Sequence, residues 1–339
     1  MRIAVYLPLL LSVIAPLGAR PLSERCEPRL ATWLLTASAL ILGVATTVSL
    51  GLLAITGLIG VPFLADLGHW SARTAQVNDP AEPPVALLAG LLLGGALLTA
   101  ARMLWRRARS IASAIWDAAC MPTPDGLVIV EDEAPDAYAL PGLPGRVVVS
   151  TGMLRTLDRA EHDILLAHER AHLTSHHYLF VALAGLGAAA NPLLRPFATA
   201  VTYTVERWAD EQAARATGDR RRVARAVGKA ALAAHNAPAP RLSTLGFRGV
   251  LGRRGPLAGA GPVPRRVAAL LAPPLTRHPG LALVTTACLA LTMVSTVAAT
   301  RDLHDLLEVV GIAHHHDPHH PDPHHPDPDR PNHDALPFG

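Results

Sequence analysis

The sequence predicts a multi-pass α-helical membrane protein with an α+β domain between its third and fourth membrane spans. Half of the 339 residues are hydrophobic and the mean hydropathy is +0.28, unlike an ordinary soluble domain. Four apolar runs approach or exceed the roughly 20 residues that a bilayer requires. Short β-rich runs and a motif with two histidines occupy the more polar stretch between the third run and the fourth. These three observations set the fold class.

Three candidate spans follow one another at the N-terminus, and the fourth lies near the C-terminus. They are residues 3–19, 33–64, 85–105 and 279–299. The second and third runs carry no charge before Asp66 and Arg102, which argues against buried core helices for both. The first run is short and ends in small residues, so a cleaved signal peptide competes with a membrane anchor there.

Arginine placement gives one orientation for all four spans. Arginines are concentrated in residues 20–32 and 106–278, whereas acidic residues dominate residues 65–84 and 300–310. Under the positive-inside rule the two arginine-rich segments are cytoplasmic and both termini lie outside. We therefore interpret the first run as a retained anchor. Lys229 is the only lysine, as in proteins from GC-rich genomes, and we expect a bacterial cell membrane.

These boundaries divide the chain into four regions. They are an N-terminal membrane region with three transmembrane helices (1–105), a cytoplasmic domain (106–278), a fourth transmembrane helix (279–299) and a disordered extracellular tail (300–339). The tail repeats His, Pro and Asp; proline prevents helix, and few apolar residues remain to fold it. Its histidines can bind a divalent metal weakly, although a merely solubilising role explains them as well.

One short motif carries chemistry. The segment from His168 to His172 reads H-E-x-x-H. On a helix, two imidazoles four residues apart project from one face, close enough to share one tetrahedral zinc ion. Glu169, beside the first histidine, can then act as general base towards a water molecule. The alternative is a core helix with two surface histidines.

The surrounding sequence favours a helix for this motif. Asp158 and Glu161 have the spacing of a capping box, so we expect a helix over residues 159–175. Further along, residues 220–235 predict an amphipathic, arginine-rich helix, and residues 236–264 a Pro/Gly-rich loop.

A third metal ligand must come from elsewhere in the chain. The extended motif with glycine at 175 and histidine at 178 is excluded, because Ser175 and Tyr178 stand there. Glu206 and Asp210 lie four residues apart in a helical stretch that ends near Gly218. One carboxylate can bind the metal while the other holds a ligand histidine. A solvated helix face is the alternative.

At this point the chain resembles the membrane-embedded gluzincin peptidases, most closely the BlaR/MecR type. The matching elements are Leu140-Pro141-Gly142, residues 147–152, residues 166–172, Asn191-Pro192, residues 206–210 and, more weakly, Arg266-Val267 with residues 270–273. The HtpX and CAAX prenyl peptidase groups share the zinc motif but usually place two spans between its halves. The penicillin-binding sensor domain of the BlaR/MecR type has no counterpart here.

The resemblance implies a zincin-like metallopeptidase domain with one Zn²⁺ per chain. His168, His172 and Glu206 would be the zinc ligands and Glu169 the catalytic base. Asp210 would be the second characteristic carboxylate, outside the ligand set.

Two segments near the motif have alternative readings. The apolar part of residues 179–204 is too short for a full span, and one crossing there would separate His172 from Glu206 across the bilayer. We therefore expect an interfacial or re-entrant segment, with a soluble core helix as the alternative. Arg146–Ser150 is our candidate for an edge strand that binds the substrate backbone; an ordinary structural strand is the alternative.

These features predict an integral-membrane zinc endopeptidase that cleaves a peptide or protein at the cytoplasmic membrane surface. The substrate implied by the resemblance is a cytoplasmic transcriptional repressor or the enzyme itself. A general quality-control peptidase of the HtpX type and a non-catalytic zinc sensor are the alternatives. Candidates for the oxyanion donor are His176, Tyr203 and Arg207. The net charge of +3 is too small to predict nucleic-acid binding, so the lipid bilayer is the other expected partner.

Overall fold

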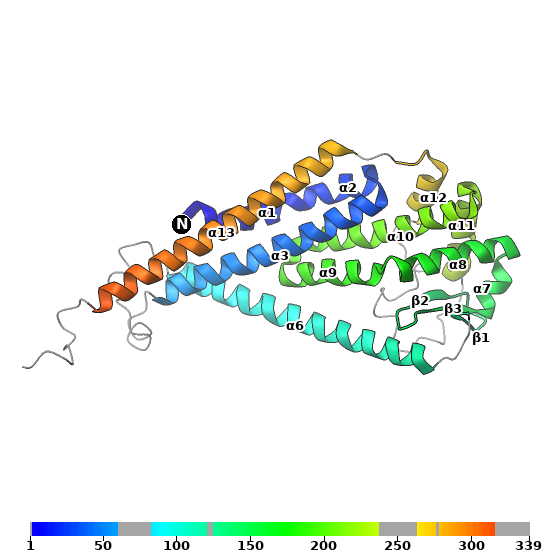
Figure 1. The fold of residues 1–339 in the computed structure, drawn as a ribbon, viewed down its shortest axis with the longest axis horizontal. Helices are drawn as coiled ribbons and strands as arrows, with labels where there is room; N and C mark the ends of the chain where they lie inside the picture. The colour runs from blue at the N-terminus through cyan, green and yellow to red at the C-terminus, as the bar shows by residue number, and fades with distance from the viewer. Residues whose placement is uncertain (1, 60–82, 121–124, 237–262, 276–277, 316–339) are drawn as a thin grey trace, which may run out of the picture.

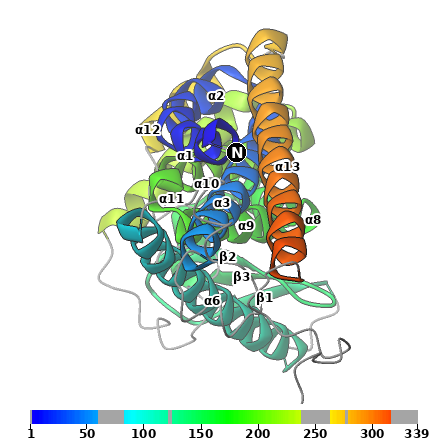
Figure 2. The same ribbon diagram turned by 90° about the vertical axis from the view of Figure 1, so that its left-hand side faces the viewer.

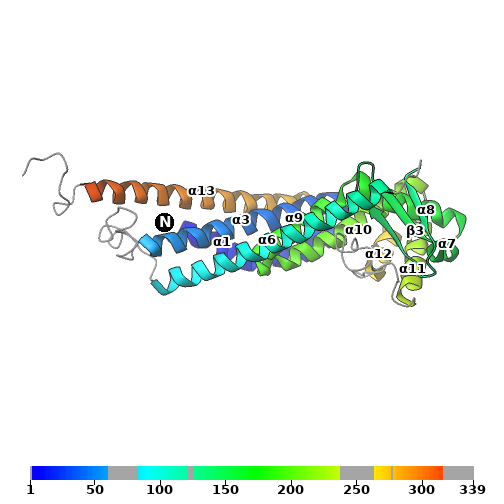
Figure 3. The same ribbon diagram turned by 90° about the horizontal axis from the view of Figure 1, so that it is seen from below.

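Long helices dominate the molecule. The computed structural model describes residues 2–59, 83–120, 125–236, 263–275 and 278–315. Figure 1 shows the long helices running side by side, with a small sheet and several shorter helices gathered at one end. Figure 3 shows the same division from below: α13 lies along the bundle, and the sheet lies beyond the bundle's far end.

Four helical segments are long and apolar enough to cross a membrane. They are Ala4–Arg25, Pro28–Thr56, Pro84–Cys120 and Pro279–Asp305. The helices involved are α1 (Arg2–Ile14) with its continuation through η1 (Ala15–Gly18) into α2 (Ala19–Arg25), then α3 (Pro28–Ile59), α6 (Pro83–Cys120) and α13 (Pro279–His315). The predicted set of four apolar spans is thus confirmed by length and composition. Residues 60–64, at the end of the predicted second span, lie outside the described residues.

α3 is the central helix of the bundle. It contacts α1, α6, α13 and two helices from the middle of the chain, and the end-on view in Figure 2 shows these elements around it. α1 packs into this bundle: Val5 is buried, and the Ser12 hydroxyl lies 2.9 Å from that of Thr46 on α3. The first apolar run therefore has the packing of a structural helix.

Two helices are longer than their apolar parts. α6 continues to Cys120, so the boundary that we place after residue 105 falls inside it. α13 continues to His315, so the prediction of disorder from residue 300 is wrong for its first part. Residues 300–315 contain no proline, and Leu303 packs back on the bundle. The His/Pro/Asp repeats from residue 316 lie outside the described residues.

A helical hairpin brings the middle of the chain back into the bundle. α9 (His177–Ala190) is followed by η2 (Pro192–Leu194) and α10 (Arg195–Thr217). With 14 residues α9 is about 21 Å long, less than a bilayer core of about 30 Å. It packs between α3 and α6, as a short helix within the bundle.

Polar contacts and one glycine hold the hairpin in place. The buried Asn191 accepts a hydrogen bond from the Leu193 N–H and donates one to Thr46 on α3, which connects the hairpin's turn to the bundle. Thr99 on α6 donates to the carbonyl of Ala189 at 2.7 Å. Gly187 lets α9 approach α3 closely, since a Cβ there would lie 2.2 Å from the carbonyl oxygen of Ala39.

The sheet has three strands in the order β1-β3-β2. These are β1 (Leu127–Val130), β2 (Ala137–Leu140) and β3 (Arg146–Ser150). β1 pairs with β3 in parallel and β2 pairs with it antiparallel. The prediction that Arg146–Ser150 is an edge strand is therefore wrong. Its run of valines is buried, as suits a central strand, and β2 is the edge nearer α8.

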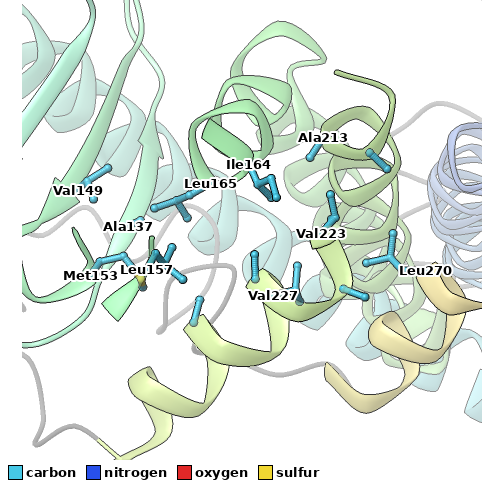
Figure 4. Close-up of a cluster of buried hydrophobic side chains, with 14 of the residues drawn as sticks. Ala137, Val149, Met153, Leu157, Ile164, Leu165, Ala213, Val223, Val227 and Leu270 are labelled. Carbon is cyan, nitrogen blue, oxygen red and sulfur yellow. The ribbon is translucent and has the colours of Figure 1, made fainter. Parts of the chain in front are cut away.

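The remaining helices are α7 (Thr151–Thr156), α8 (Arg159–Thr174), α11 (Arg220–Asn236) and α12 (Val263–Leu271). Of these, α7 and α8 pack on the sheet, and α11 and α12 pack on the far side of these helices and of α10. Their apolar side chains join residues of the sheet in one core, which extends from Val149 and Ala137 through Leu165 to Val223 and Leu270 (Figure 4). The predicted helix over 220–235 is confirmed, whereas most of the predicted loop, residues 237–262, lies outside the described residues.

The close contact between α3 and α9 generates a stability prediction. We expect Gly187→Ala to lower the melting temperature by several degrees, because the new Cβ meets backbone that must move apart, and overpacking costs about 1–3 kcal/mol. Gly95→Ala is the control: nothing lies within 4 Å of its Cβ position on α6. That change should be neutral or stabilise by up to about 1 kcal/mol through helix propensity. Thermal unfolding of the detergent-solubilised protein tests this. Equal effects of the two substitutions would contradict the role given to Gly187.

Candidate metal centre

α8 presents the H-E-x-x-H residues towards the interior. The expected capping box is present: Asp158 accepts from the Glu161 N–H, and the Glu161 carboxylate accepts from the Asp158 N–H, both at 2.9 Å. Lys229 on α11 donates to the same Glu161 carboxylate at 2.7 Å, which fixes the start of α8 against α11. On this helix His168, Glu169 and His172 are buried, each at most 3% exposed, whereas Arg170 of the motif is exposed.

α10 supplies the third candidate ligand. After the turn at Asn191, α10 runs back beside α8 and places Glu206 opposite the two histidines. The Nε2 atoms of His168 and His172 are 3.3 Å apart. The carboxylate oxygens of Glu206 lie 3.6 Å from Nε2 of His168 and 3.7 Å from Nε2 of His172. The hairpin thus brings together residues from both sides of the apolar segment.

These distances fit a zinc ion. At Zn–N distances of about 2.0–2.1 Å, tetrahedral geometry separates ligand atoms by about 3.3–3.5 Å. The donor atoms of His168, His172 and Glu206 all lie within 4.8 Å of one another. Two imidazoles and one carboxylate also form a donor set that zinc prefers, with one position left for water or substrate.

Asp210 and Arg266 form the outer layer of this centre. One Asp210 oxygen lies 3.1 Å from Nδ1 of His168, on the ring edge opposite the metal-facing nitrogen. Arg266 from α12 donates to both Asp210 oxygens, at 2.6 and 2.8 Å, and its third nitrogen lies 2.9 Å from Glu206. Arg266 is only 2% exposed. It therefore connects the carboxylate behind His168 to the ligand carboxylate.

The charges of this layer favour a cation between the imidazoles. Burial alone would lower the pKa of His168, but Asp210 and Glu206 outweigh it and raise that pKa to about 10. Burial would raise the pKa of Asp210 and of Glu206, yet the positive charge of Arg266 lowers both. Both carboxylates are thus held ionised beside the histidines.

Glu169 has a different environment from the other acids. It is fully buried, and neither of its carboxylate oxygens has a hydrogen-bond partner among the described residues. Burial is the main reason why its pKa is raised to about 7. A buried carboxylate with this pKa next to a ligand histidine is suited to accept and return a proton near neutral pH.

His177, which sequence reasoning missed, completes the centre. Its Nδ1 lies 3.0 Å from Nδ1 of His172, so the His172 N–H can be held while its Nε2 faces the other ligands. Burial lowers the pKa of His177 to about 3, and the ring stays neutral as an acceptor. Trp208 packs on the His177 ring, with 4.7 Å between the ring centroids. A signal existed in the sequence, since His176 and His177 stand four and five residues after His172.

The three candidate oxyanion donors lie in other surroundings. Arg207 donates to the Ser23 carbonyl on α2 and lies over the Tyr203 ring at 5.8 Å. Tyr203 also lies under Arg265. His176 is exposed, and its ring contacts Tyr178. The contacts of Arg207 and Tyr203 join α2, α10 and α12, and that of His176 joins the start of α9, so none of these contacts reaches His168 or His172.

The comparison with protein families gives one match. The sequence model of peptidase family M48, a family of metallopeptidases, matches residues 101–273, about half of the chain. The metallopeptidase part of our prediction is confirmed, whereas the BlaR/MecR type stays a prediction. No curated protein and no solved structure matches the chain.

Arg266 generates a prediction with a neighbouring control. We expect Arg266→Met to destabilise the protein by about 3–5 kcal/mol, because it leaves the Asp210 charge buried without its partner. Arg265→Met removes a half-exposed ion pair with Glu24 and should cost about 1 kcal/mol or less. Chemical or thermal unfolding of both variants measures the difference. Similar losses for the two would count against a special role for Arg266.

A second prediction concerns His177. We expect His177→Phe to weaken zinc binding by about 10–100-fold, because the phenyl ring fills the space but cannot accept the His172 N–H. His176→Asn is the control, since it replaces the exposed neighbour and asparagine tolerates the left-handed backbone there. Competition with a fluorescent zinc chelator measures both affinities. Unchanged affinity in the phenylalanine variant would remove His177 from the centre.

Proposed function

The chain belongs to peptidase family M48, and from this we propose that it is an integral-membrane, zinc-dependent endopeptidase acting at the cytoplasmic membrane surface of a bacterium. The observation that carries this proposal is the convergence of His168, His172 and Glu206 beside the buried, unpartnered carboxylate of Glu169. A purely structural metal site has four protein ligands and needs no such base.

The proposed roles follow from this geometry. Bound zinc would polarise the scissile carbonyl and make a water molecule more acidic. Glu169 takes the proton from that water and returns it to the leaving amine. Asp210 and His177 hold the rings of His168 and His172 from behind, at 3.1 and 3.0 Å. Arg266 keeps Asp210 and Glu206 ionised, so the ligand set stays ready for a cation.

β2 is the proposed platform for the peptide substrate. One side of β2 pairs with β3, and among the described residues no strand pairs with its other side. α8, which carries the motif, packs against β2. An extended peptide can add to such an edge through main-chain hydrogen bonds, which gives affinity with little dependence on sequence.

The hairpin supports a site at the membrane surface. α9 and α10 pack on helices that are apolar enough to span a bilayer, while α8 and the sheet lie at the end of the bundle. The arginine distribution assigns this end to the cytoplasm. A substrate would therefore be a cytoplasmic protein or the cytoplasmic end of a membrane protein.

A transcriptional repressor is the substrate that the BlaR/MecR resemblance suggests. Because the family that matches is M48, a quality-control peptidase with broad membrane-protein substrates is the second candidate. Proteomic comparison of wild-type and inactive strains separates them. One stabilised repressor supports signalling, whereas many accumulated membrane proteins support quality control.

The catalytic assignment is tested by two variants and one control. Glu169→Gln should keep about one zinc per chain and lose about 10²–10⁴-fold in cleavage rate, because the proton acceptor is gone. Glu206→Ala should lose zinc as well as activity. Asp163→Asn, which removes an exposed carboxylate from the same helix, should change neither. Metal analysis and peptide cleavage in detergent give both readouts.

Two results would contradict the assignment. Full zinc retention in Glu206→Ala would exclude Glu206 as a ligand. A zinc-loaded wild type that cleaves neither itself nor any unfolded membrane protein or repressor would favour the non-catalytic sensor instead.

A further inference from the structure

A stripe of arginines runs along α6 directly after its apolar part. Arg102, Arg106 and Arg109 stand four and three residues apart, so they project from one face of the helix. All three are exposed, and within the described part of the chain no carboxylate forms an ion pair with them. This arginine stripe is not used by the proposed catalytic reaction.

The arginine stripe borders a shallow, open hollow whose lining residues all lie on α6. Its lining combines guanidinium groups, a hydroxyl group and an aromatic ring, and includes Arg102, Arg106, Arg107, Arg109, Trp105 and Ser113. Guanidinium and hydroxyl donors are the groups that bind phosphate oxygens. Trp105 is 66% exposed, and a tryptophan beside arginines is typical of the headgroup layer of a bilayer.

Packing fixes the depth of the stripe relative to the other spans. Ala89 on α6 and Ala299 on α13 belong to one buried cluster, in which both helices pack against α3. From Ala299 back to Pro279, α13 contains no charged residue over about 30 Å of helix. From Ala89 onwards, α6 reaches its first charged residue, Arg102, after only about 20 Å. Arg102 therefore lies nearer to the bilayer centre than the end of α13. Its guanidinium must reach outwards or draw phosphate groups inwards.

From these observations we propose that the arginine stripe binds the headgroup phosphate of an anionic phospholipid. The proposal rests on the membrane location proposed above. Exposed apolar side chains, including Leu97 and Leu98, continue from the stripe along the lipid-facing part of α6. This surface fits acyl chains below a headgroup, and a free phosphate ion would leave it uncovered. A lipid is therefore the occupant that contacts both the arginine stripe and the apolar side chains beside it.

The position of the stripe gives the lipid a structural effect. Thr99 donates to the Ala189 carbonyl, and Met103 lies against Gly185, so the hollow adjoins the contact between α6 and α9. A lipid held there neutralises mutual repulsion of the arginines and stabilises this contact. Binding should therefore raise the melting temperature as well as retain lipid.

The experiment compares lipids and matched charge variants. Full-length protein in neutral detergent is titrated with phosphatidylglycerol, phosphatidylcholine or inorganic phosphate, with native mass spectrometry and melting temperature as readouts. We expect phosphatidylglycerol alone to bind and raise the melting temperature. Arg102→Gln/Arg106→Gln/Arg109→Gln should weaken this binding by about a hundredfold, because each interfacial arginine contributes about fivefold. Arg106→Gln alone should weaken it by about fivefold and serves if the triple variant does not fold.

The control removes the same charge elsewhere. Arg221→Gln/Arg222→Gln/Arg225→Gln deletes three exposed arginines from α11 and should leave binding unchanged. Equal losses in both triple variants, equal binding of phosphatidylcholine, or saturation by inorganic phosphate would each overturn the lipid site. Zinc content and peptidase activity are measured on the same samples. A wild type that binds phosphatidylglycerol but contains no zinc would refute the catalytic proposal and leave the lipid site standing.

Discussion

The buried ion pair between Asp210 and Arg266 is the interaction on which the rest of the centre depends. Through it α12 contacts α10, and through the 3.1 Å contact between Asp210 and His168 it reaches α8. Two buried carboxylates would be unfavourable without positive charge beside them. Arg266 supplies one permanent positive charge, and the ligand geometry provides for a second. The ion pair between Asp210 and Arg266 therefore both orients His168 and balances the buried negative charges.

Local signals in the sequence were sufficient for much of this architecture. Uninterrupted apolar runs predicted the four candidate spans, because no soluble helix needs so many consecutive uncharged residues. The capping box at Asp158 and Glu161 located the start of α8, and Gly218 ends α10 in the expected left-handed conformation. The spacing of His168 and His172 predicted a shared metal, the family resemblance implied Glu206 as the third ligand, and the structure brings the three together.

What sequence reasoning missed depends on contacts between distant segments. The order of strands is decided by pairing, so the valine run of β3 could not reveal that it is central and that β2 is the edge. Arg266 is one of many arginines, and only the packing of α12 buries it. His177 looked like a neighbour of the motif, but the turn at His176 directs it back to His172. The end of α13 was misjudged because a low-complexity tail was extended too far upstream.

The helical hairpin of α9 and α10 has a consequence for how the metal centre is assembled. His172 lies on α8 and Glu206 on α10, and the chain between them runs through α9 and a turn that is hydrogen-bonded to α3. The position of Glu206 opposite the two histidines therefore depends on the packing of α9 and α10 within the bundle, and a change in that packing reaches the metal centre without touching any of its residues.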